Sequence, residues 1–203
     1  MTLTLIHTAK VHEDTFNTLR DRLAPGAEMH HVTRPDWLDR ARAGDETVAD
    51  DMAHVIAKAP GTTLCTCTTL GEVAESLGAL RIDWPMMQAA AQTGGAIMLV
   101  YALDSTYEPS LALLDRALEA TGTRQKVHPL PLTQYWPLFE AGEADAFTSV
   151  IAGEIRQAAM TLPNLSCVVL AQASMAPAAA RLSDMRAPVL ASPELALRAA
   201  LET

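Results

Sequence analysis

The chain contains 203 residues, of which 49% are hydrophobic and 19% charged, and its formal net charge is −9. That length can bury a sizeable core, and the composition excludes a disordered protein. The longest apolar stretches, such as Ala96–Leu103, are far too short to cross a bilayer. No basic run interrupts the acidic sequence, so we expect neither nucleic acid nor an anionic membrane surface as a partner.

The first residues and the cysteine count indicate a reducing compartment. Met1 leads straight into an apolar stretch with no basic start and no small-residue cleavage signal, which predicts a cytoplasmic location. The three cysteines, Cys65, Cys67 and Cys167, are an odd number in a chain too large to need disulfides. The question is therefore what each thiol does.

Short β-rich stretches alternate with amphipathic segments along the chain. Predicted helices include Asp45–Ala59, a segment after Cys67 that carries Leu70, Val73 and Leu77, and a segment from near Pro109 to Gly122. Further helices are expected up to about Met160, over Met175–Leu182 and from Pro193. The predicted strands are Leu3–His7, Glu28–Thr33, Thr62–Cys67, Ala96–Leu103, Val127–Leu132, Ser166–Ala171 and Pro188–Ala191. This alternation predicts an α/β fold with parallel sheet covered by helices.

Two strand–turn–helix segments about a hundred residues apart are alike. One is Leu64-Cys65-Thr66-Cys67-Thr68-Thr69 and the other is Val169-Leu170-Ala171-Gln172-Ala173-Ser174. Each runs from a buried strand into small polar residues and then a helix, which suggests two similar lobes. In such folds ligands bind beyond the carboxyl ends of the strands, so these turns are candidate sites.

Cys67 is the candidate for chemistry. At a strand end before a helix, a thiol meets free backbone N–H groups and the helix dipole, which favour the thiolate. We therefore expect a modest lowering of its pKa, and the same N–H groups could hold a carboxylate. The alternative is that Cys67 is simply a small buried residue. Cys65 and Cys167 lie inside strands, where core packing is expected, and no nucleotide loop or metal-site motif is present, so no metal is expected.

Several motifs, in order along the chain, resemble one known family. Thr66-Cys67-Thr68-Thr69-Leu70-Gly71 resembles the first cysteine motif of the aspartate/glutamate/hydantoin racemase superfamily, and the stretch from Val168 to Met175 resembles its second. Segments similar to those of less characterised members are Arg81-Ile82-Asp83, Asp104-Ser105-Thr106 and Ser192-Pro193.

The resemblance implies a fold of two flavodoxin-like lobes with parallel sheets related by a pseudo-twofold, with the active site between them. The lobes would comprise residues 1–92 with 186–203, and 93–185. Family members use no cofactor, and one cysteine from each lobe flanks the substrate, one taking a proton and the other delivering one. Members are commonly oligomers, so a homo-oligomer is possible here.

The second cysteine of the family falls on Gln172, whose neutral amide cannot serve as a catalytic acid or base. Two-base racemisation is therefore doubtful, while one thiol still suits an isomerisation or a one-sided protonation after decarboxylation, as in the arylmalonate decarboxylases of the superfamily. We expect a cofactor-independent racemase or isomerase-like enzyme acting on a small carboxylate substrate through Cys67. The alternatives are a decarboxylase-type lyase, a non-catalytic carboxylate-binding protein and, less suited to the spacing of Cys65 and Cys67, thiol–disulfide chemistry.

Other groups are expected to bind the substrate. Thr68 and Thr69 would hold a carboxylate, with Ser105 and Thr106 doing the same from the second lobe, although these hydroxyls also suit helix capping. The second motif, Gln172-Ala173-Ser174, would hydrogen-bond the substrate or an enediolate oxygen. His7, at the end of the first strand, is either a second acid/base group or only a hydrogen-bonded strand-end histidine.

Overall fold

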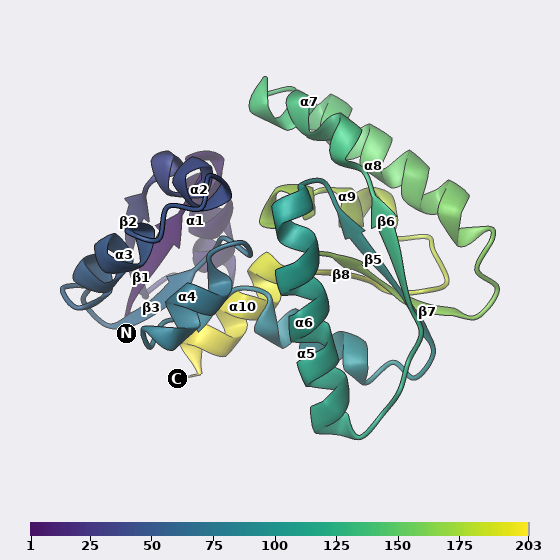
Figure 1. Ribbon diagram of the computed structural model, residues 1–203, viewed down its shortest axis with the longest axis horizontal. Coiled ribbons are helices and arrows are strands. Elements are labelled where there is room, and N and C mark those ends of the chain that lie inside the picture. The colour runs from purple at the N-terminus through teal and green to yellow at the C-terminus, as the bar shows by residue number, and fades with distance from the viewer. Residues whose placement is uncertain (203) are drawn as a thin grey trace. The chain divides into compact units, whose positions relative to one another are not determined.

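The computed structural model describes residues 1–202, which form two compact units. Unit 1 comprises Met1–Asp83 and the described residues from Pro193 onward, and unit 2 comprises Trp84–Ser192. Each unit contains one four-stranded sheet with flanking helices (Figure 1). The expected α/β class, with parallel sheets in two lobes, is confirmed. None of the helices within residues 1–202 is long and apolar enough to cross a membrane.

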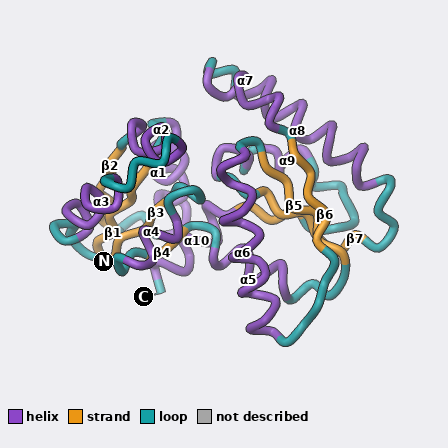
Figure 2. Tube along the Cα trace, viewed as in Figure 1, coloured by secondary structure: helices purple, strands orange, loops and turns teal. Residues whose placement is uncertain are grey.

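The sheet of unit 1 has the strand order β2-β1-β3-β4, and every neighbouring pair is parallel. Its strands are β1 (Thr2–His7), β2 (Glu28–Thr33), β3 (Thr62–Cys65) and β4 (Leu80–Arg81). β1 is central and almost wholly buried, which explains its continuous apolar sequence. Figure 2 shows these strands in orange and the helices of the chain in purple.

Five helices accompany this sheet. They are α1 (Val11–Leu23), α2 (Pro35–Arg42), α3 (Val48–Ile56), α4 (Gly71–Ser76) and the C-terminal α10 (Ser192–Leu201). The side chains of Trp37, Val48 and Met52 bring α2 and α3 into a core cluster with Ile6 and Cys65. α10 buries Leu197 and Ala200, and its Glu194 accepts a hydrogen bond from Arg22 at the end of α1.

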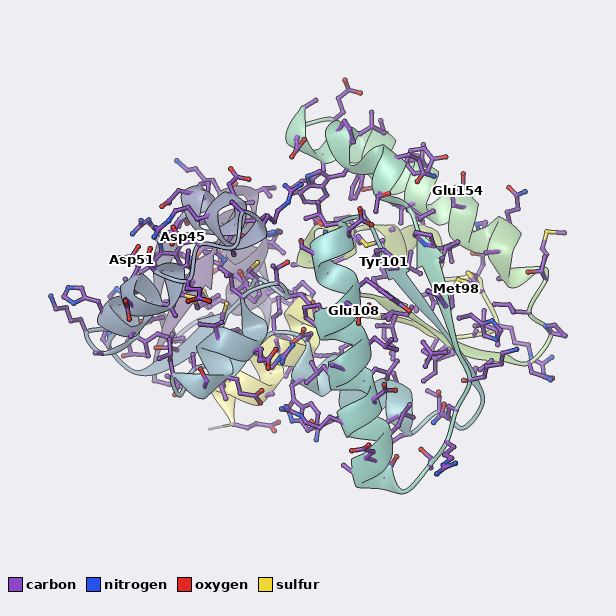
Figure 3. All side chains as sticks on the ribbon, in the orientation of Figure 1. Asp45, Asp51, Met98, Tyr101, Glu108 and Glu154 are labelled. Carbon is purple, nitrogen blue, oxygen red and sulfur yellow. The ribbon has the colours of Figure 1, made fainter. Side chains whose placement is uncertain are left out.

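Arg40 joins α2 both to the turn before α3 and to α3 itself. Its guanidinium donates to Asp45 and to Asp51, each at 2.7 Å, and both carboxylates are labelled in Figure 3. Asp45 also accepts a hydrogen bond from the Thr47 backbone N–H at 2.9 Å. The helix predicted from Asp45 therefore begins later, at Val48, because Asp45 is used in the turn.

The sheet of unit 2 has the order β6-β5-β7-β8, again wholly parallel. Its strands are β5 (Ala96–Tyr101), β6 (Val127–Pro131), β7 (Leu165–Leu170) and β8 (Val189–Ala191). Its helices are α5 (Trp84–Ala91), α6 (Asp104–Thr121), α7 (Trp136–Glu140), α8 (Ala144–Ala159) and α9 (Ala178–Arg181), with 3-10 turns η1 (Thr133–Tyr135) and η2 (Ala173–Met175).

Helices cover both faces of this second sheet. Met98 and Val100 of β5 pack with Ile151 and Ile155 of α8 in one buried cluster. Ile97 and Leu99 alternate with them and are equally buried, so they face the opposite side. Figure 1 shows α6 and α8 on opposite sides of the β5–β6 pair.

The two sheets repeat one topology. β1, β2, β3 and β4 occupy in unit 1 the same order that β5, β6, β7 and β8 occupy in unit 2. β3 ends at Cys65 and β7 ends at Leu170, so Cys67 and Gln172 each lie two residues beyond equivalent strands. The similarity of the two cysteine-motif-like segments thus reflects equivalent places in repeated sheets.

Further features differ from the sequence-based prediction. α6 begins at Asp104, which places Pro109 inside the helix rather than near its start, while Gly122 ends the helix in the left-handed conformation. The chain between Met175 and Leu182 forms η2 and the short α9 instead of one continuous helix. The predicted lobes, 1–92 with 186–203 and 93–185, assign α5 differently from the compact units, which place it in unit 2.

Candidate active site

In unit 1 the carboxyl ends of β1 and β3 bring two dipeptides together. Ile6 is paired with Cys65, and beyond this pair the Thr66 N–H donates to the Ile6 carbonyl at 2.9 Å. Parallel pairing therefore runs past the last strand residue, and His7-Thr8 lies alongside Thr66-Cys67. This is the edge of a parallel sheet where ligands usually bind.

The Cys67 thiol is surrounded by hydrogen-bond donors. The Thr8 hydroxyl and the backbone N–H groups of Thr69 and Leu70 bond to the sulfur, and each lowers the pKa of the thiol. Burial acts in the other direction and is stronger, because Cys67 is only 8% exposed, and the Asp83 carboxylate adds to it. The net effect raises the pKa of Cys67, so the expected lowering is wrong. Desolvation outweighs the donors, and α4 is a short helix of six residues.

A buried ion pair packs against the first residue of α4, directly after the turn that carries Cys67. Arg81 donates to the two oxygens of Asp83 at 2.7 and 3.0 Å, and both side chains are buried. Gly71, the first residue of α4, packs directly against the Arg81 guanidinium, since a Cβ there would lie 3.1 Å from Nε. Arg81 thus packs against the start of α4, while the Asp83 carboxylate is the member of the pair that raises the pKa of Cys67.

His7 is fully buried and both of its ring nitrogens are hydrogen-bonded. Nδ1 lies 2.8 Å from the Thr66 hydroxyl and Nε2 lies 2.8 Å from Nδ1 of His31. The Thr66 hydroxyl donates to the Ile6 carbonyl, so its oxygen accepts from Nδ1–H of His7. His31 extends this chain of polar contacts, because its Nε2 lies 3.2 Å from Oδ1 of Asn17. Burial, followed by the neighbouring His31 and His12, lowers the pKa of His7 to about 3. The ring is therefore neutral and held between protein partners.

The other two cysteines lie in the cores. Cys65 is fully buried and donates to the Cys67 carbonyl at 3.6 Å, and burial raises the pKa of its thiol. Cys167 is fully buried, accepts from the Thr93 hydroxyl at 3.5 Å, and also has a raised pKa caused by burial. All three cysteines are free thiols.

Thr68 and Thr69 form the turn that joins β3 to α4. Thr68 is buried and its carbonyl accepts from the Gly71 N–H at 3.0 Å. The N–H of Thr69 bonds to the Cys67 sulfur. The turn thus directs two backbone N–H groups at the Cys67 sulfur. From the sequence we expect these same N–H groups to bind a substrate carboxylate as well.

In unit 2 the carboxyl ends of β5 and β7 place Gln172 beside Ala102. Val100 is paired with Leu170, and two residues beyond, the Gln172 Oε1 accepts from the Ala102 N–H at 2.6 Å. Gln172 is buried and takes the position equivalent to Cys67. The Gln172 amide can therefore form hydrogen bonds at this position, but it cannot act as an acid or a base.

The remaining candidates of unit 2 lie next to Gln172 or at the start of α6. Ala173 begins η2 and is buried, and the Ser174 hydroxyl that follows is buried with no hydrogen-bond partner among the described residues. Ser105 and Thr106 lie in the first turn of α6, directly after β5, where the Thr106 N–H donates to the Leu103 carbonyl at 3.0 Å. These residues share the carboxyl edge of the second sheet.

Each sheet therefore gathers its own predicted residues at its carboxyl edge. In unit 1 these are His7, Cys67, Thr68 and Thr69, and in unit 2 they are Ser105, Thr106, Gln172, Ala173 and Ser174. Thr8 was missed by the sequence reasoning, although its place directly after the first strand was the available signal. Within residues 1–202 no group of three or more His, Cys, Asp or Glu side chains is arranged to hold a metal ion.

Comparison with solved structures identifies the fold. Aspartate racemase from Picrophilus torridus superposes with a TM-score of 0.71 at 13% identity, covering 99% of this chain and 93% of that one. Allantoin racemase from Klebsiella pneumoniae gives a TM-score of 0.64 at 17% identity, covering 100% and 86%. A Gly74Cys mutant of arylmalonate decarboxylase, in a sulfate-associated form, gives 0.55 at 15% identity, covering 100% and 92%.

These structures define the class of fold: the chain has the two-sheet α/β fold of the solved allantoin, glutamate and aspartate racemases, as the resemblance of its motifs predicted. By sequence alone no family model matches, and no curated protein matches. The likeness therefore rests on the three-dimensional arrangement of the two repeated sheets and their helices.

Proposed function

We propose that this chain is a cofactor-independent enzyme that acts at the carbon next to a carboxylate and uses Cys67 as its acid/base. One observation carries the proposal. A thiol at the carboxyl edge of the first sheet is bonded by Thr8 and two backbone N–H groups, while its equivalent in the second sheet is Gln172. Solved structures with this fold include racemases and an arylmalonate decarboxylase.

The raised pKa of Cys67 makes the neutral thiol the resting form. In the proposed step the α-carbon first loses carbon dioxide, or loses a proton to the Cys67 thiolate, and the electrons of the broken bond form an enediolate. The enediolate then takes the proton from sulfur, and the C–H bond forms as the S–H bond breaks. The resulting thiolate is stabilised by Thr8 and the N–H groups of Thr69 and Leu70. Water then returns a proton to sulfur. In the reverse direction the thiolate removes the same proton.

Substrate binding is proposed for the polar groups at both carboxyl edges. In unit 1, Thr68 and Thr69 would hold a carboxylate. In unit 2, the polar groups of Ser105, Thr106 and Gln172-Ala173-Ser174 are the corresponding candidates for substrate binding. The Ser174 hydroxyl supports this proposal. It is buried and has no hydrogen-bond partner among the described residues, which lowers stability unless a ligand forms the missing hydrogen bond. His7 would act as a positioning residue, since its ring holds Thr66, the neighbour of Cys67.

The presence of Gln172 in place of a second thiol favours a second candidate, a decarboxylase-type lyase. Loss of carbon dioxide from a malonate-like acid leaves the bonding electrons on the enediolate, which needs one proton from one side. Cys67 alone can deliver it. Two-base racemisation needs a second acid/base group, which Gln172 does not provide.

The experiment is incubation of a panel of amino acids, 2-substituted carboxylic acids and malonates in deuterated water. We expect deuterium at the α-carbon of at least one acid, with carbon dioxide released if the lyase is correct. Cys67→Ser should abolish the signal and the matched core variant Cys167→Ala should retain it. Calorimetric binding without exchange or product would instead indicate a non-catalytic carboxylate-binding protein.

A further inference from the structure

A pocket in unit 2 lies at the opposite edge of the second sheet from Gln172. It has a volume of about 470 Å³ and is formed where β5, β6 and β7 begin, by residues around Ala96, Lys126 and Asn164. β5 is six residues long, so this edge is roughly 20 Å from the carboxyl edge of the same sheet. The pocket is therefore separate from the residues assigned to the proposed reaction.

The pocket is basic in an acidic protein. Arg124, Lys126 and His128 all line it, although the chain has a net charge of −9. Arg124 and Lys126 precede β6 and His128 is its second residue, so the three alternate along the chain, and such spacing in an extended segment directs side chains to one side. None of the three forms an ion pair with a carboxylate within residues 1–202. The positive charges of Arg124 and Lys126 are thus not neutralised by the protein's own carboxylates within the described residues.

Neighbouring arginines in unit 2 are used differently. Arg156 binds Asp184 and Arg181 binds Asp145, so these cations are neutralised at the surface. Arg124 is exposed at the rim of the pocket and has no such partner in the part of the chain that the structure describes. A cluster of positive groups beside a cavity raises the local potential and attracts anions.

The backbone that carries the cluster is fixed. The Gln125 amide donates to the Ala91 carbonyl at 2.5 Å and accepts from the Gly95 N–H at 3.2 Å. The Lys126 carbonyl accepts from the Ile97 N–H at 2.9 Å. These bonds hold the segment between α6 and β6 against the start of β5, so the positions of the basic residues are set before any ligand binds.

The rest of the lining is mainly apolar. Leu162 and Pro163 from the turn before β7 and Ala96 from β5 form a large part of it. A bare inorganic ion would leave this surface unused, whereas an anionic group attached to a small apolar body would contact both parts. The volume lies within the range of small-molecule sites.

We propose that this pocket binds a small organic anion, with a carboxylate or phosphate against Arg124, Lys126 and His128 and an apolar body against Leu162 and Pro163. The site is independent of the proposed reaction at Cys67. Guanidinium and ammonium groups recognise both kinds of anion through charge-assisted hydrogen bonds. The probes must therefore separate the two head groups.

The test uses the full-length chain with benzoate, phenyl phosphate and inorganic phosphate as probes, followed by amide NMR and calorimetry. We expect one of the two aromatic anions to bind at millimolar concentration or better, more tightly than inorganic phosphate, and to shift the amide signals of Gly95, Ala96 and Lys126. In the double variant Arg124→Gln/Lys126→Gln the Kd should rise about tenfold or more. The signals of Thr68 and Thr69 report any binding near Cys67 separately.

The control is Lys58→Gln/Arg186→Gln, which removes the same charge from exposed positions outside the pocket. It should leave the Kd within about twofold, since neither side chain lines the pocket and charges at exposed positions are screened by salt. The proposal is overturned if no probe shifts the pocket amides, or if both double variants weaken binding equally. Circular dichroism of each variant confirms that the fold is unchanged.

Discussion

At the residue scale, the three cysteines differ in what their sulfur atoms contact. Cys65 and Cys167 are packed in the sheets, while Cys67 combines a hydroxyl donor with two backbone N–H groups from the following turn. Burial dominates in all three and raises each pKa. The donors around Cys67 matter when the proton leaves, because they stabilise the thiolate in a poorly solvated place.

Thr8→Val should make Cys67 less reactive. The Thr8 hydroxyl lowers the pKa of the thiol, so its removal raises the pKa further and reduces the thiolate fraction at neutral pH. The measurement is the rate of iodoacetamide labelling of Cys67, followed by mass spectrometry between pH 7 and about pH 10. Thr2→Val, at an exposed hydroxyl, is the control. Equal pH profiles for Thr8→Val and the unmodified chain would contradict the assigned contact.

His7 makes stability depend on pH. Its pKa is about 3 in the folded chain and near 6.5 when unfolded, so between these values the unfolded chain binds more protons. The contribution is complete above about pH 6.5 and is lost as the pH falls towards 3. His7→Asn, which keeps a donor for Thr66, should reduce the slope of unfolding free energy against pH by about 1 kcal/mol per pH unit between pH 4 and 6.

Urea unfolding at several pH values measures this slope. A His7→Asn protein with the original slope would show that the buried ring does not titrate on unfolding.

The sequence allowed Cys67 to be chosen and Cys65 and Cys167 to be set aside, because strand position alone separates them. It could not give the direction of the Cys67 pKa, since that depends on the balance of burial against donors from Thr8 and the following turn. The His7–His31 contact was also hidden, because it joins residues 24 positions apart on neighbouring strands.

At the element scale, the turn before β3 depends on a glycine. Gly61 has φ +71°, and a Cβ there would lie 1.9 Å from the carbonyl oxygen of Thr2. Gly44 has a similar φ of +78° but open space around it. Comparing alanine at the two positions therefore distinguishes the cost of a positive φ, which both share, from the cost of a steric clash with Thr2, which only Gly61 would incur.

Gly61→Ala should therefore be much more destabilising than Gly44→Ala. Gly44→Ala should lose about 1 kcal/mol for the left-handed backbone. Gly61→Ala should lose about 2 kcal/mol more, because β1 and β3 must move apart. Denaturant unfolding measures the free energy of unfolding of the two variants. Equal decreases would contradict the prediction, because they would mean that β1 and β3 can move apart at no cost in stability.

The sequence predicted the elements with strong patterns and missed those without them. β5 and β7 are continuous apolar runs bounded by turn residues, and both were located to within two residues at each end. β4 contains only two residues, too few for a period, and its place depends on pairing with β3. α2 buries only Trp37, so its helical pattern is weak.

At the scale of the whole molecule, each compact unit has its own core. One buried cluster draws only on unit 1, from Ile6 to Ala79, and another only on unit 2, from Met98 to Leu182. Unit 2 is a single continuous stretch, Trp84–Ser192, whereas unit 1 needs α10 from the other end of the chain.

Residues 84–192 alone should therefore fold. We expect a cooperative thermal transition and dispersed amide NMR signals from this fragment, because its sheet and the cluster around Met98 are complete within it. Residues 1–83 without α10 should be markedly less stable than the same residues joined to 193–203, since Leu197 and Ala200 are buried. A fragment 84–192 without cooperative unfolding would contradict the division.

The most direct test of Cys67 as the single acid/base is the stereochemistry of deuterium incorporation in deuterated water, followed by chiral analysis of the product. One thiol with Gln172 as its counterpart can deliver deuterium from one side only. We predict a single labelled enantiomer from the unmodified chain and no labelled product from Cys67→Ser. Labelled product of both configurations, or undiminished labelling by Cys67→Ser, would contradict the assignment.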